Sequence, residues 1–158
     1  MKGNKKIIDR LNALLADELT AINQYMVHSE MCANWGYERL HEAIEKRAIT
    51  EMKHAEKLIE RILFLEGMPI VSKLNEIKIG SDVKAQFESD LAAEYMAIKA
   101  YNEGIALAVE VGDNGTRALL ESILSDEEHH VDWLEAQLDQ INQMGIENYL
   151  TEQVQSRE

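Results

Sequence analysis

The sequence has very few of the residues that cross-link or interrupt a chain. Cys32 is its only cysteine, so a disulfide within the chain and a paired-cysteine metal site are both excluded. Pro69 is its only proline, runs of β-branched residues are scarce, and apolar residues recur at helical spacing. We therefore predict an all-α protein, and the length of 158 residues favours a single domain over residues 1–158.

An excess of positive charge is also missing. Lysine and arginine contribute 16 residues against 29 acidic ones, which gives a net charge of −13. This charge disfavours nucleic acid and anionic membranes as partners and favours cations, including metal ions. The first six residues are basic, but no apolar run follows them. We predict no signal peptide, no transmembrane segment and a cytoplasmic location.

Apolar periodicity and helix-breaking residues together predict four long helices and one short helix. Their ranges are about 5–34, about 37–65, from just after the capping pair Ser81-Asp82 to near Gly112, from just after Asn114-Gly115 onward, and about 146–153. The first and third connections are tight and join antiparallel neighbours. The middle connection, roughly residues 66–82, is long enough to cross the length of a helix of about 42 Å. We predict a ferritin-like four-helix bundle with a long crossover between its second and third helices.

The most informative feature of the sequence is a carboxylate–histidine pattern that occurs twice. Glu18 is followed by the pair Glu51 and His54. Each member has a counterpart 76 residues later, namely Glu94, Glu127 and His130. Residues at i and i+3 share a helix face, so each Glu-x-x-His pair points to one place. One glutamate from each of two helices and one such pair from each of the other two form the ligand set of a di-iron carboxylate site.

Metal ions explain why these acidic residues stand at core positions. An unpaired buried ion costs several kcal/mol, whereas four carboxylates and two neutral histidines around two Fe²⁺ sum to zero charge. Iron suits these ligands, and manganese and zinc are not excluded. We expect Glu51 and Glu127 to bridge the two metal ions. We expect His54 and His130 to be terminal nitrogen ligands, and Glu18 and Glu94 to be terminal carboxylate ligands.

Two tyrosines obey the same offset. Tyr25 and Tyr101 each lie seven residues, or two turns, after the lone glutamate of their helix. We expect both to hydrogen-bond the carboxylates, with Tyr25 contributing to the reactive site. Plain packing in the core is the alternative.

Two similar pairs lack this support. The offset of 76 takes Glu38 and His41 to Asn114 and Arg117, so we interpret Glu38-x-x-His41 as surface. The pair Asp126-x-x-His129 lies off the apolar face of its helix, and we expect it to face solvent.

The sequence resembles the bacterioferritins over essentially its whole length. The resemblance is carried by residues 1–3, 18–25, 51–63 and 145–150, of which the third stretch is especially specific. All six predicted metal ligands match that family's ferroxidase ligands one by one. The resemblance implies a homo-oligomeric hollow cage of 24 subunits that oxidises Fe²⁺ with O₂ or H₂O₂ and stores the ferric mineral, for iron storage and detoxification.

The resemblance also implies a haem. Met52 matches the methionine that, with its twofold mate, supplies both axial ligands of a haem b, which passes electrons from a small ferredoxin to the mineral during release. From the residues alone, Met52 is an ordinary methionine in a dimer interface. Some members carry an additional iron site at positions that Lys46 and Thr50 occupy here, so we do not expect that site.

Further hypotheses remain open at this point. Asp132 and Asp139 lie seven apart on one helix face and either line an acidic iron entry path or form a solvated surface. The main alternative function is a di-iron oxidase or oxygenase with an organic substrate, although the short chain leaves little room for a substrate pocket. A non-enzymatic haem or DNA-protecting cage is disfavoured by the charge and by the complete ligand set within one chain.

Overall fold

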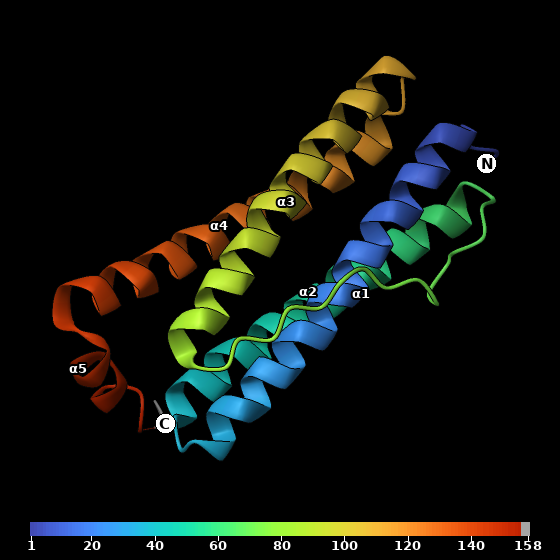
Figure 1. Ribbon diagram of the computed structural model, residues 1–158. Helices are drawn as coiled ribbons and strands as arrows, with labels where there is room; N and C mark the ends of the chain where they lie inside the picture. Colours follow the sequence, from blue (N-terminus) through green and yellow to red (C-terminus); the bar gives the residue numbers. More distant parts are fainter. Residues whose placement is uncertain (156–158) are drawn as a thin grey trace.

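The computed structural model describes residues 1–155 and confirms the predicted bundle (Figure 1). The helices are α1 (Lys5–Asn34), α2 (Glu38–Phe64), α3 (Val83–Glu110), α4 (Asn114–Met144) and α5 (Ile146–Thr151). No strand occurs among the described residues. Helix α1 packs along α2, α3 packs along α4, and the two hairpins meet through α1 with α3 and α2 with α4. Within the described part of the chain, no helix is long and apolar enough to cross a membrane.

The two hairpin turns repeat each other as the ligands do. Gly36 and Gly112 lie 76 residues apart and have φ angles of 85° and 73°, in the left-handed region that favours glycine. The next residue in each turn donates its N–H to a helix carbonyl, Tyr37 to Cys32 at 2.9 Å and Asp113 to Ala108 at 2.8 Å. Each long helix before a turn is therefore closed by the same capping arrangement.

The crossover between α2 and α3 runs along the outside of α1 (Figure 1). Side chains of α1 accept hydrogen bonds from its backbone, with Thr20 Oγ1 accepting from Asn75 N at 2.8 Å and His28 Nε2 from Gly80 N at 3.0 Å. Gly80 approaches α3 so closely that an added Cβ would lie 2.2 Å from Gln86 N. These contacts carry the chain from one end of the bundle to the other, so α2 and α3 run parallel.

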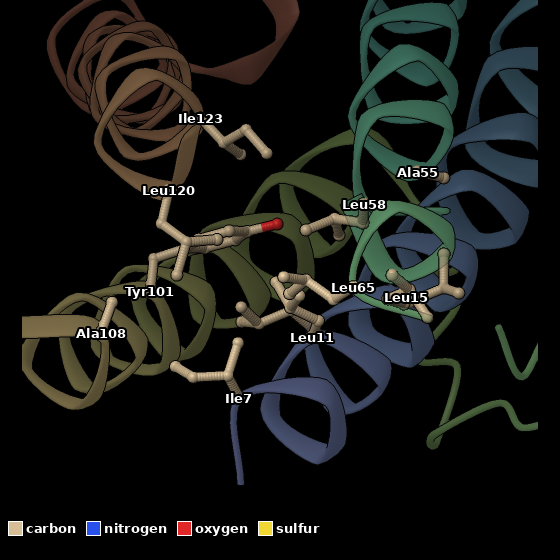
Figure 2. Packing of buried hydrophobic residues seen from close by; sticks show 12 residues of the cluster. Ile7, Leu11, Leu15, Ala55, Leu58, Leu65, Tyr101, Ala108, Leu120 and Ile123 are labelled. Atoms are coloured by element: carbon tan, nitrogen blue, oxygen red, sulfur yellow. The ribbon is translucent and has the colours of Figure 1, made fainter. Parts of the chain in front are cut away.

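Buried apolar residues from all four long helices fill the core of the bundle. In Figure 2, Leu11 from α1, Leu58 from α2 and Leu120 from α4 point toward one another, and Tyr101 reaches in from α3. All four are fully buried. At roughly 25 cal/mol per Å² of apolar surface, each such residue contributes about 1.5–3 kcal/mol to folding.

The structure corrects some predicted boundaries. Asn114 and Gly115 belong to the first turn of α4 and do not precede it, because Asp113 caps the helix and accepts from Thr116 N at 3.0 Å. Helix α5 ends at Thr151, two residues before the expected end. Helix α1 has the predicted bounds, and Asp82 caps α3 as predicted.

Candidate metal centre

The six predicted ligands come together in the middle of the bundle. Five of them are no more than 2% exposed and His130 is 8% exposed. Their ligand atoms form two groups, each with all atoms within 4.8 Å of one another. We call the first the His54 half-site (Glu18, Glu51, His54 and Glu127) and the second the His130 half-site (Glu51, Glu94 and His130). Glu51 is the one residue common to both groups.

Each histidine turns its Nδ1 atom toward carboxylate oxygens. In the His54 half-site, His54 Nδ1 lies 3.2 Å from Glu127 Oε1 and 3.6 Å from Glu18 Oε2. In the His130 half-site, His130 Nδ1 lies 3.1 Å from Glu94 Oε1. Both Nδ1 atoms and one oxygen from each of the four glutamates lack a hydrogen-bond partner, and a metal ion would satisfy these buried atoms. The donor set therefore fits two divalent metal ions.

A buried arginine, which the sequence analysis missed, also belongs to this site. Arg47 Nη2 lies 2.5 Å from Glu51 Oε1 and 2.8 Å from Glu127 Oε2, the two carboxylates expected to bridge the metals. Arg47 Nη1 donates to the carbonyl of Asp126 at 3.3 Å, and its side chain is 12% exposed. The position of Arg47, four residues before Glu51 on one helix face, was the available signal.

Asp126 is exposed as predicted and also contacts a residue of the centre. Its side chain is 50% exposed, but Asp126 Oδ2 accepts from His54 Nε2 at 2.8 Å. A carboxylate on the far nitrogen fixes a ligating histidine's orientation and leaves Nδ1 free for the metal. The link joins α4 to α2, and a periodicity within one helix does not reveal it.

His130 is held differently. The ring of Trp133 stacks on it with centroids 6.0 Å apart, and Tyr25 packs edge-on at 5.4 Å. The ring also lines a cavity of about 640 Å³ between α2, α4 and the C-terminal segment. Lys46 and Thr50 line the same cavity, so the two positions singled out in the sequence lie beside the His130 half-site.

The two tyrosines hydrogen-bond the terminal carboxylates across the bundle. Tyr25 of α1 donates to Glu94 of α3, and Tyr101 of α3 donates to Glu18 of α1 at 2.5 Å. Burial and the neighbouring carboxylates raise the pKa of both phenols well above the usual value, so both stay protonated donors. Each hairpin thus holds a ligand of the other.

Crowding and burial of the carboxyl groups shift the pKa values of the residues in the site. Burial and the charge of Glu51 raise the pKa of Glu18 and of Glu127 well above the usual value. Burial opposes ionisation of Glu51 too, but hydrogen bonds with Glu18 and His54 outweigh it and lower the pKa of Glu51. Burial disfavours the charged form of His54, yet the nearby carboxylates, Glu127 first among them, raise its pKa to about 12. Without metal, the site therefore keeps protons that a metal ion displaces.

Other residues from the sequence analysis lie outside this centre. Met52 is 46% exposed on α2, and Asp132, Asp139 and His129 are exposed on α4. Glu38 is exposed as predicted. His41 is not: its side chain is only 18% exposed and it contacts Ser29.

The chain is similar to known proteins over almost its whole length. Residues 8–144 match the family model described as a ferritin-like domain. The chain is 42% identical over 149 residues to a bacterioferritin of Mycolicibacterium paratuberculosis, covering 94% of each chain. It is 43% identical over 149 residues to the bacterioferritins of Brucella melitensis and Rhodobacter capsulatus, covering 94% of this chain and 92% of each relative.

Proposed function

The chain belongs to the bacterioferritins, within the ferritin-like family, and is an iron-storage protein; we propose that it oxidises Fe²⁺ at the two half-sites. In this reaction each Fe²⁺ gives one electron to O₂ or H₂O₂, and the ferric product is stored as mineral. The single observation that carries the proposal is the set of six buried ligands in two groups that share Glu51.

The residues of the site prepare it for Fe²⁺ as substrate. Glu51 and Glu127 would bridge the two ions, and Glu18 and Glu94 would each bind one, held by a tyrosine hydroxyl. His54 must lose its proton before Nδ1 binds iron, and Asp126 then orients the neutral ring through Nε2. Fe²⁺ thus competes with protons and with the guanidinium of Arg47 for the same carboxylates.

Aerobic addition of Fe²⁺ to the metal-free protein tests this function. We expect a fast rise in ferric absorbance that saturates near two Fe²⁺ per chain, followed by a slower phase in which added iron stays in solution. A fast phase that ends at two, with later iron precipitating, would contradict storage and favour a di-iron oxidase acting on an organic substrate.

The cage and the haem belong to the same proposal. Bacterioferritin relatives support an oligomeric cage, and we propose 24 subunits, to be checked by light scattering after gel filtration. Met52 and Ile49 lie three residues apart on α2 and are 46% and 44% exposed, so an apolar strip with a thioether is available to a haem between two copies. Haem b bound there would supply one-electron transfer from a ferredoxin to the mineral.

Replacing the thioether tests the haem site directly. Met52→Leu is expected to lose the haem absorbance after reconstitution and to slow reductive iron release. Met68→Leu, at an exposed methionine on the crossover, is the matched control and should keep both. Full haem binding by Met52→Leu would contradict this assignment.

A further inference from the structure

A second cluster of metal-ligating side chains lies away from the buried centre. Glu30 on α1 and His41 and Glu45 on α2 place one ligand atom each within 4.8 Å of one another. His41 Nε2 lies 3.6 Å from Glu45 Oε2. Atoms that bind one metal ion at about 2.1 Å in tetrahedral geometry lie about 3.4 Å apart, so this separation already suits a metal site.

The hydrogen bonds of His41 point its free nitrogen into this cluster. His41 Nδ1 lies 3.0 Å from the backbone carbonyl of Ser29, which can only accept. Nδ1 therefore carries the proton, a tautomer assigned from the hydrogen-bond network. Ser29 is 2% exposed and its hydroxyl lies 2.9 Å from the same nitrogen. A backbone carbonyl on one ring nitrogen is the usual way in which the other nitrogen is prepared to bind a metal.

This arrangement lacks a cation. In the neutral ring, the Nε2 lone pair faces the oxygens of Glu30 and Glu45. Among residues 1–155, neither glutamate forms an ion pair with a lysine or arginine. Both carboxylates are exposed, so an ion can reach them from solvent.

In the α3–α4 hairpin, the corresponding positions contain a positively charged side chain. The offset of 76 takes His41 and Glu45 to Arg117 and Glu121, whose side chains pair at 3.4 Å. It takes Glu30 to an alanine. The first hairpin therefore exchanges an arginine for a histidine and adds a carboxylate, which together form a metal-ligand set.

We propose that Glu30, His41 and Glu45 bind a divalent transition-metal ion at the surface of the α1–α2 hairpin. One nitrogen and two carboxylate oxygens leave one tetrahedral position for water, and this ligand set accepts Zn²⁺ and Fe²⁺. The site is separate from the oxidation centre and shares no ligand with it.

Zinc titration of the full-length, metal-free protein, followed calorimetrically, tests the proposal. We expect one equivalent of Zn²⁺ per chain beyond the two that bind at the buried half-sites. His41→Gln should lose that equivalent and keep the other two. His129→Gln, at an exposed histidine of α4 without a carboxylate cluster, is the matched control and should keep all three. An unchanged stoichiometry in His41→Gln would overturn the proposal.

Two further measurements separate metal binding from a simple histidine–glutamate ion pair. His41→Arg copies the residue of the other hairpin, so the metal-free protein should stay folded while the additional zinc equivalent disappears. Crystals soaked in Zn²⁺ should give anomalous density between the three side chains. If the soaked crystals fill the buried half-sites but show no such density, His41 is only an ion-pair partner and the assignment fails.

Discussion

The two hairpins supply the same ligands but surround them differently. His54 has a carboxylate on its far nitrogen, at 2.8 Å, whereas His130 rests on Trp133 and borders a cavity of about 640 Å³. The position that matches Asp126 in the first hairpin is Thr50, whose hydroxyl donates to a carbonyl of its own helix. The repeat thus sets which residues meet at the candidate metal centre, and departures from it make the two half-sites unequal.

Arg47 is the second departure. Its counterpart 76 residues later is Ile123, a fully buried core residue. The guanidinium pairs with one oxygen of each carboxylate that we expect to bridge, Glu51 Oε1 and Glu127 Oε2, while their other oxygens lie nearer to His54. We therefore expect the His54 half-site to bind metal more tightly and the His130 half-site to fill second.

The largest effect should come from removing the shared ligand. Glu51→Ala removes a carboxylate from both half-sites, so the rate of fast Fe²⁺ oxidation should fall by more than about a hundredfold. Loss of a residue that only hydrogen-bonds a metal ligand usually costs less than this. Stopped-flow ferric absorbance measures this. The thermal midpoint of the metal-free protein should also fall, because Arg47 and His54 lose a buried ionised partner. Glu56→Ala, at an exposed glutamate of the same helix, is the control and should oxidise normally.

Removing the guanidinium of Arg47 should lower the stability of the metal-free protein and increase the stabilisation that zinc gives. Arg47→Met removes the guanidinium that pairs with Glu51 and Glu127, so urea unfolding of the metal-free protein should need roughly 3 kcal/mol less free energy. Added Zn²⁺ should restore stability by a larger margin than in the parent. Lys46→Met, which removes an exposed charge one residue earlier, should change neither quantity. Equal loss of stability with and without zinc would show that Arg47 acts only in packing.

The carboxylate on His54 should matter for one half-site only. Asp126→Ala should weaken zinc binding at the His54 half-site by about tenfold. This is the lower end of the range for removing a hydrogen-bond partner of a ligating histidine, because Asp126 is half exposed. Calorimetry resolves the two half-sites, and Asp132→Ala on the same helix is the control. Equal weakening of both would mean that the half-sites are not independent.

The smallest effect concerns the turns. Asp113 caps α4 and pairs with Arg61 at 2.9 Å, whereas Tyr37 at the matching place gives α2 no side-chain cap. Asp113→Ala should lower the free energy of unfolding by about 1–2 kcal/mol at neutral pH. Asp139→Ala, at an exposed aspartate, should change it little.

The same variant gives a pH test. Burial opposes ionisation of Asp113, but hydrogen bonds from Thr116 and Arg61 outweigh it and lower its pKa. Its stabilisation is therefore complete above the unfolded-state pKa of about 4 and is lost as the pH falls toward the lower folded-state value. The difference between parent and Asp113→Ala should shrink below about pH 4 in denaturant titrations. A difference that stays constant there would exclude the carboxylate as its source.

The sequence predicts that the six residues meet in the core because their spacing is a property of single helices. Helical periodicity put Glu18, Glu51 and their counterparts on the core face, and the offset of 76 separated them from Glu38 and His41. Contacts between helices were predicted only where the repeat indicated them, as for Tyr25 and Tyr101. The link from Asp126 to His54 depends on how α4 rotates against α2, and the buried pair of His28 and Asp90, 3.0 Å apart, joins α1 to α3.

The crossover has a consequence for how the protein could be cut. Residues 70–79 are all exposed, and Gly80 is the first buried position after them. Each hairpin contributes half of the ligands and half of the core, so packing, and not the peptide link, holds the halves together. A protease cut within 70–79 should therefore leave two fragments that elute together and still bind metal. The molecule behaves as a fused pair of hairpins, the form expected if one ancestral hairpin once worked as a dimer.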